Sequence, residues 1–180
     1  MKEFFKKNFA IVLAFALPVV FIAVIALSAY LPSIFLSTNY NFVYTSCTDG
    51  VDYYPYYCSD YLQKRYSVVN GKFVVNSMDF DGNYTARVFL HDTKNNESRE
   101  ITLEEAQTLS LNGLLTSPDG VTVSSNYDSG TDLLFFDSGS SYGYYLTKGS
   151  SRSKLNLINN GDGYYQDNVQ FIGWVLPGRD

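Results

Sequence analysis

The amino-acid sequence predicts a mainly β protein, with a single N-terminal transmembrane helix followed by one mostly antiparallel β domain, a sandwich or an open propeller-like sheet. Three observations lead to this fold class. An almost unbroken apolar run covers residues 9–31. The remainder is rich in Tyr, Phe and the turn-forming residues Gly, Asn, Asp and Ser. Asn70-Gly71 also separates two short apolar segments, which is typical of a β-hairpin.

The apolar run is long enough to cross a membrane as a helix. At ~1.5 Å per residue it would span roughly 34 Å, against a hydrocarbon core of about 30 Å. A membrane helix tolerates Pro18 because neighbouring groups can satisfy the backbone carbonyl that proline leaves free. We therefore predict a cytoplasmic N-terminus over residues 1–8, a transmembrane helix over 9–31, a juxtamembrane linker over 32–39 and an extracytoplasmic β domain over 40–180.

The basic residues give the orientation. Lys2, Lys6 and Lys7 precede the run, and the next Lys or Arg is Lys64. The positive-inside rule then keeps the N-terminus in the cytoplasm and places the β domain outside, as in a single-pass protein of the cell membrane. A signal peptide cleaved near residues 26–28 is the alternative, although the run exceeds the ~7–15 apolar residues of a usual signal peptide. Both alternatives export the β domain.

Charge and cysteine content restrict the partners. The formal net charge is −5, so the chain has no electrostatic reason to bind nucleic acid. The expected partners are the lipid bilayer, through residues 9–31, and an envelope glycan or protein. Cys47 and Cys58 are the only cysteines, and an exported pair predicts a disulfide. Two thiols and the single His91 cannot complete a four-ligand zinc site, so we expect no metal or cofactor.

The segment between the cysteines is the candidate contact surface. It carries four tyrosines around Pro55, namely Tyr53, Tyr54, Tyr56 and Tyr57. They are too closely spaced for all four rings to point into one core. We expect some of them at the surface, where tyrosine offers contact area and a hydroxyl group. The alternative is that they pack against the strands or lie in the membrane interface.

Local patterns predict the elements of the β domain in order. The first strand covers residues 40–44. A hairpin over residues 65–76 places Val68 opposite Phe73 and Tyr66 opposite Val75. The next strand, residues 85–91, has Ala86, Val88 and Leu90 on one face, and Arg87, Phe89 and His91 on the other. After a polar turn over residues 92–98, the chain returns as a strand over 99–101.

The second half begins with a helix signal. Thr102 and Glu105 match a capping box, which predicts one short helix near residues 103–111, the only helix expected after the apolar run. Ser117-Pro-Asp-Gly120 predicts a tight turn. Further strands are expected over residues 121–123, 133–136, 142–147, 154–158 and 168–175.

Part of this half is similar to a known architecture. The segments "RVFLHDTKNNESREIT" and "LTSPDGVTVS", followed by "LLFFDSG" and "YGYYLTKGSSRSKLNL", resemble blades of β-propellers of the Tol-system and WD-repeat-like kind. The resemblance covers residues 85–157 and implies consecutive strands arranged in blades. A closed ring takes typically four or more blades of four strands, so it implies at most an open propeller-like sheet here.

The motifs that could carry chemistry are incomplete. Residues 139–143 fit G-x-S-x-G, but a nucleophile elbow needs a histidine later in the chain, and His91 lies upstream. Residues 151–154 spell S-x-x-K without its partner motifs. Residues 79–83 resemble a calcium loop, but the glycine is misplaced and no Glu stands at position twelve. His91-Asp92 is an acid–base pair without a nucleophile.

We therefore predict no catalytic, cofactor or metal residues. The expected function is that of a non-enzymatic cell-envelope binding or scaffold module. One alternative is a hydrolase of envelope polymers that uses two Asp or Glu carboxylates. The other is a pilin-like subunit, although Asn8 and Leu13 depart from the usual processing pattern and Pro32 ends the apolar run.

Overall fold

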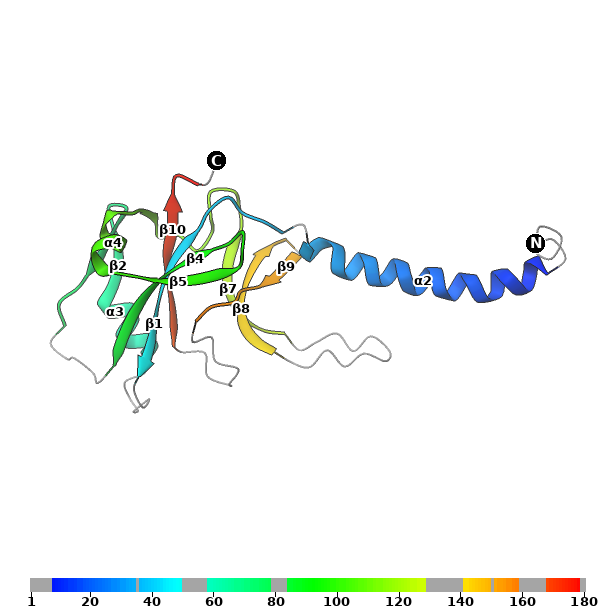
Figure 1. Ribbon diagram of the computed structural model, residues 1–180, viewed down its shortest axis with the longest axis horizontal. Coiled ribbons are helices and arrows are strands. Elements are labelled where there is room, and N and C mark those ends of the chain that lie inside the picture. Colours follow the sequence, from blue (N-terminus) through cyan, green and yellow to red (C-terminus); the bar gives the residue numbers. More distant parts are fainter. Residues whose placement is uncertain are drawn as a thin grey trace.

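The computed structural model describes residues 8–34, 36–49, 58–78, 84–128, 141–149, 151–158 and 168–178. In this part of the chain, a long helix precedes a mainly β domain whose strands pair antiparallel (Figure 1). The helices are α2 (Phe9–Ile34), α3 (Cys58–Arg65) and α4 (Leu103–Thr108). The strands are β1 (Phe42–Asp49), β2 (Tyr66–Val69), β3 (Lys72–Val75), β4 (Thr85–Asp92), β5 (Glu97–Ile101), β6 (Ser110–Asn112), β7 (Thr122–Asp128), β8 (Ser141–Lys148), β9 (Ser151–Lys154) and β10 (Val169–Leu176).

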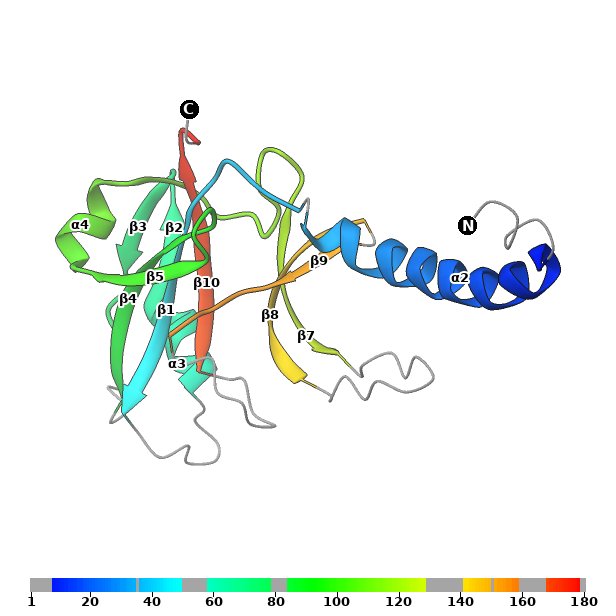
Figure 2. The same cartoon turned by 45° about the vertical axis from the view of Figure 1, so that its right-hand side comes forward.

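Helix α2 projects away from the β domain, and its C-terminal end lies beside β9 (Figures 1 and 2). Its described side chains cover residues 9–25, and apolar groups such as Phe15 and Phe21 are exposed. In the described part of the chain, no helix is both long and apolar enough to cross a membrane. The structure therefore does not support the predicted transmembrane helix.

Strands β1 and β10 form the centre of a five-stranded sheet with the order β5-β4-β1-β10-β6. Phe42 on β1 pairs with Trp174 on β10 and with His91 on β4. Residues 42–47 are all buried, because other elements cover both faces of the sheet. A strand buried on both faces shows no alternation of apolar and polar residues. The predicted first strand, residues 40–44, therefore began two residues early and ended too soon, since β1 covers Phe42–Asp49.

One face of the central sheet packs against the β2–β3 hairpin, α3 and α4. The hairpin has the predicted register, with Val68 opposite Phe73. Asn70 and Gly71 have φ angles of 50° and 73°. These are the positive values that a type I′ turn requires. The predicted hairpin over residues 65–76 is confirmed.

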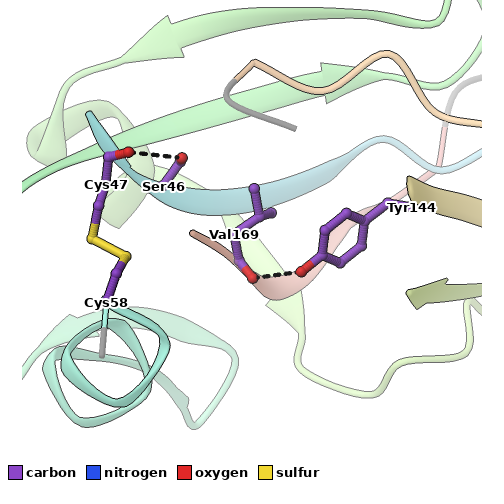
Figure 3. Close-up of a disulfide and its surroundings, with 5 residues drawn as sticks. All are labelled: Ser46, Cys47, Cys58, Tyr144 and Val169. Carbon is purple, nitrogen blue, oxygen red and sulfur yellow. Dashed lines mark hydrogen bonds between the residues drawn. A yellow bond between two sulfur atoms is a disulfide. The ribbon is translucent and has the colours of Figure 1, made fainter. Parts of the chain in front are cut away.

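A disulfide joins this layer to the central sheet. Cys47 on β1 is bonded to Cys58, the first residue of α3, with a Cα–Cα distance of 6.3 Å (Figure 3). The predicted disulfide is confirmed, but the prediction that only one helix follows the apolar run was wrong. The missed helix α3 has Asp60 in its first turn and Lys64 and Arg65 in its last, which favours a helix through its dipole.

Helix α4 confirms part of the predicted capping box. Thr102 Oγ1 accepts a hydrogen bond from the backbone N–H of Glu105 at 3.1 Å. The Glu105 carboxylate does not cap the helix but forms an ion pair with Arg99. The helix ends at Thr108 and not near residue 111, because residues 110–112 pair with β10 as strand β6.

The other face of the central sheet packs against a three-stranded sheet with the order β7-β8-β9 (Figure 2). Val121, Val123 and Leu146 from this side meet Tyr44 and Trp174 of the central sheet. The two sheets form a sandwich around a mainly aromatic core. Residues 85–157 are thus divided between two sheets, so the consecutive blades implied by the propeller resemblance do not form.

Two strands predicted near β8 and β9, over residues 133–136 and 154–158, are not confirmed. The predicted strand over residues 133–136 lies outside the described residues. The strand expected over residues 154–158 was placed too late, since β9 ends at Lys154. The next residues cross to the loop between β4 and β5, where the backbone N–H of Asn156 donates to Asn96 Oδ1 at 2.9 Å. Hydrogen bonding to this loop takes the place of strand pairing.

The linker after α2 is held by one carboxylate. Thr38 Oγ1 donates to Asp119 Oδ1 and Oδ2 at 2.9 Å, and the Asn39 backbone N–H donates to Oδ2 at 3.0 Å. Ser117 Oγ also donates to Asp119 Oδ1. Partial burial raises the pKa of Asp119, but the hydrogen bonds from Ser117, Asn39 and Thr38 outweigh it and hold this pKa below its ordinary value. The linker is therefore fixed to the turn over residues 117–120.

Candidate functional site

A cleft of about 410 Å³ lies between β10 and β7, where the two sheets meet. The polar residues of its lining are Thr122, Ser124, Ser125, Tyr144 and Gln170. Its apolar lining consists of Leu115, Val123, Val169 and Phe171. Among the described residues that line the cleft, none carries a charged side chain.

The cleft forms where two strands lose their neighbours. Strand β6 pairs only with residues 174–176 of β10. Within the described residues, residues 169–171 therefore have a strand neighbour on the β1 side and none on the other. Strand β7 likewise pairs with β8 along one edge, while its other edge meets residues 115–117 only near Thr122. Two largely open strand edges thus face the same cleft.

Side chains satisfy the carbonyl groups along the β10 edge. The Tyr144 hydroxyl reaches across from β8 and donates to the carbonyl oxygen of Val169 at 2.8 Å (Figure 3). Gln170 Nε2 donates to the carbonyl oxygen of Phe171 at 3.1 Å. In a paired strand these carbonyls would accept from a neighbouring backbone N–H. Here two side-chain donors occupy the place of a strand.

Trp174, the only tryptophan of the chain, lies behind the cleft and is fully buried. Its Nε1 donates to the carbonyl oxygen of Leu115 at 3.1 Å, and its ring centroid lies 5.6 Å from that of Phe171. Both Leu115 and Phe171 line the cleft. The fluorescence of this residue is therefore a natural reporter of events in the cleft.

His91, the sequence candidate for acid–base chemistry, lies away from the cleft in the buried core. Its Nδ1 is 2.9 Å from Ser98 Oγ, a contact that sequence reasoning missed because the two residues lie on adjacent strands. Its ring packs 4.8 Å from that of Phe42, and its Nε2 has no partner among the described residues. A catalytic triad needs an acid on that second nitrogen. The Ser98–His91 contact therefore lacks the acid that would orient the His91 ring for catalysis.

Burial also makes His91 a poor base near neutral pH. It lowers the pKa of His91 to about 4, and the charge of Asp92 and hydrogen bonding to the Asn96 side chain, which both favour the protonated ring, oppose this effect only in part. We assign His91 a structural role in the core between β1 and β5.

The remaining sequence candidates fall into two groups. The four tyrosines of the candidate contact surface, Tyr53, Tyr54, Tyr56 and Tyr57, and the calcium-like residues 79–83 lie outside the described residues. Ser141 of the G-x-S-x-G pattern starts strand β8, whereas a nucleophile elbow leads from a strand into a helix. The S-x-x-K pattern forms β9. Across the described ranges, no group of three or more His, Cys, Asp or Glu residues could hold a metal ion.

The fold and the cleft define a mainly β, antiparallel protein with one disulfide and an uncharged groove between two sheets. No protein-family model matches the chain, and no curated protein and no solved structure matches it.

Proposed function

We propose that this chain is a non-enzymatic binding module that is anchored in the cell membrane and displays its β domain on the extracytoplasmic side. The observation that carries the proposal is the cleft between β10 and β7. Its volume of about 410 Å³ lies within the range of roughly 300–1,000 Å³ that ligand pockets occupy. It combines apolar walls with a few polar groups, and its described lining residues include none of the carboxylates that a hydrolase of envelope polymers would use.

Three features support the membrane location. Apolar side chains such as those of Phe15, Leu17 and Phe21 are exposed along α2. Lysines stand before the apolar run and not directly after it, which favours export of the rest. The buried disulfide suits an oxidising compartment. The proposed parts are residues 1–8 inside, 9–31 in the bilayer, 32–39 as linker and 40–180 outside.

The binding role can be tested with a matched pair of substitutions. Ser125 is exposed and lines the cleft, so Ser125→Arg should fill it with a charge while leaving the fold intact. Gln107→Arg adds the same side chain at an exposed position on α4, on the opposite face of the central sheet. The full chain in mild detergent would be titrated with envelope glycan fragments and uncharged peptides, and Trp174 fluorescence would be followed.

The expected result is that Ser125→Arg weakens binding about tenfold or more, because a charge in the cleft opposes an uncharged ligand. Gln107→Arg should bind as the unsubstituted chain does. If Ser125→Arg binds as tightly as Gln107→Arg, the cleft is not the binding site.

The membrane topology needs a separate experiment. A reporter enzyme that works only after export would be fused behind Asp180, and intact cells or spheroplasts would be treated with protease. An active reporter and a degraded β domain agree with the proposal. Protection of the β domain until the cells are lysed would contradict it.

A further inference from the structure

We propose that the ligand of the cleft is an extended, uncharged peptide segment that pairs with the open edge of β10 as an added strand. This inference rests on the proposed binding function and specifies its ligand. In β-strand addition, main-chain hydrogen bonds supply the affinity and alternate side chains supply the specificity. The β10 edge offers such a main-chain surface next to a cleft of suitable size.

The register shows which backbone groups face the cleft. Residues 169, 170 and 171 pair with Ser46, Thr45 and Tyr44 of β1. In an antiparallel ladder, each residue directs its N–H and C=O toward the same neighbour, and successive residues alternate. The carbonyls of Val169 and Phe171 accept hydrogen bonds from cleft-side groups. The N–H groups of the same two residues therefore face the cleft as well.

A peptide strand has room to follow β6. Strand β6 pairs with residues 174–176 and ends at Asn112, after which the chain leaves the β10 edge. An added strand would continue the line of β6 along residues 169–171, about 10 Å at ~3.3 Å per residue. One face of this strand would lie toward Thr122 and Ser125 of β7, which line the cleft.

The lining also indicates the chemistry of the peptide. Among the lining residues that the structure describes, none carries a charge that could compensate a buried ion. Alternate side chains of an added strand would point to opposite faces. Apolar ones suit the wall formed by Leu115 and Phe171, and hydroxyl-bearing ones suit the wall formed by β7. We therefore commit to an uncharged segment that alternates apolar and hydroxyl residues.

Tyr144 and Gln170 distinguish this ligand from a glycan. For an incoming strand, the Tyr144 hydroxyl and the Gln170 amide are competitors, because they occupy the carbonyls that the peptide N–H groups need. Removing either competitor should strengthen peptide binding. A glycan would instead use these side chains as hydrogen-bonding partners, and their removal should weaken its binding. The two ligand classes thus predict opposite signs for the same substitutions.

The experiment uses the full chain in mild detergent and a set of capped pentapeptides of the form Thr-Xaa-Thr-Xaa-Thr, in which Xaa is an uncharged residue. Binding is followed by Trp174 fluorescence. The tightest peptide is then made in two N-methylated versions, with the methyl groups on the amides at odd positions or on those at even positions. Only one of these two sets can face β10.

The expected result is that one N-methylated peptide loses binding and the other keeps it. Tyr144→Phe and Gln170→Ala should each tighten the unmethylated peptide about three- to tenfold, which corresponds to one hydrogen bond that no longer has to be broken. On saturation, the amide protons of Val169 and Phe171 should exchange more slowly with solvent.

Several outcomes would overturn the inference. Equal binding of the two N-methylated peptides would exclude main-chain pairing. If an envelope oligosaccharide binds, no peptide binds, and Gln170→Ala weakens the oligosaccharide, the ligand is a glycan. The proposed binding function would then still hold. A dimer that the peptides cannot displace would make the occupant a second copy. If neither peptides nor oligosaccharides bind, this inference and the proposed binding function both fail.

Discussion

His91 should make the stability of the β domain depend on pH in a window where few other side chains titrate. Its ring is fully buried against Phe42, and its Nε2 has no partner in the described part of the chain. Protonation would therefore place a charge in the core that its surroundings stabilise only in part. Burial lowers the pKa of this group from its ordinary value near 6.5 to about 4. Between these two pH values His91 is mostly protonated in the unfolded chain and mostly neutral in the folded chain.

The sign and size of the effect follow from linkage. A group whose folded pKa is lowered favours the folded state above its unfolded pKa, and this stability is lost as the pH falls. One pKa unit corresponds to about 1.4 kcal/mol. Between pH 7.5 and pH 4.5, the free energy of unfolding should therefore fall by about 2 to 3 kcal/mol on account of His91.

The assay is urea unfolding at a series of pH values and constant ionic strength, followed by Trp174 fluorescence. The control variant is His91→Gln, which keeps a hydrogen-bonding group near Ser98 but cannot titrate. Its absolute stability is expected to be lower, but its free energy of unfolding should change much less with pH in this window. Equal pH slopes for the two proteins would refute the assignment of His91 as a buried neutral group.

Two further predictions concern the links that hold the layers together. Asp119→Asn should lower the free energy of unfolding by about 1 kcal/mol, discounted for the exposure of this carboxylate, and should speed hydrogen exchange at Asn39. The stabilisation by Asp119 should persist at neutral pH and be lost only as the pH falls through its lowered pKa, below the ordinary value of 3.8. An unchanged hydrogen-exchange rate at Asn39 would contradict the proposed role of Asp119 in holding the linker. Replacing Cys47 and Cys58 together by serine should cost about 2–3 kcal/mol in urea unfolding, and mass spectrometry of the non-reduced chain should show no free thiol in the unsubstituted protein.

Local chemistry made parts of the fold predictable from sequence. The type I′ turn requires positive φ values at two successive residues, and Asn70-Gly71 is the pair best suited to them. The N-terminus of α4 is capped by the side chain of Thr102, a residue type that is typical of this position. In both cases the signal and the structure lie within a few residues of each other.

Helix α3 shows why other parts were missed. It is eight residues long and directly follows a tyrosine-rich segment that suggests strands or loops. Its charges favour a helix, with Asp60 early and Lys64 and Arg65 late, but they contribute only a few tenths of a kcal/mol to about 1 kcal/mol. Its stability comes from burying Tyr61 and Leu62, and the packing partners of these residues cannot be identified from the local sequence.

The cleft was beyond prediction for a related reason. Its walls come from β7 and β10, and Tyr144 reaches between them from β8. No motif marks these residues, since serines, threonines and a glutamine are common on any strand. What makes them a candidate site is the end of β6 at Asn112, after which residues 169–171 of β10 have no second strand neighbour among the described residues. The length of a neighbouring strand is a tertiary property.

The pairing of β1 with β10 determines when the domain can fold. The first strand of the domain lies between β4 and the last strand, and the core residues Phe42 and Trp174 come together only in that pairing. A chain that has been synthesised only as far as β9 lacks the neighbour of both β1 and β6. Contacts between such distant segments slow folding, because a long loop must close before they form. We therefore expect the central sheet to form only after residues 169–176 are available.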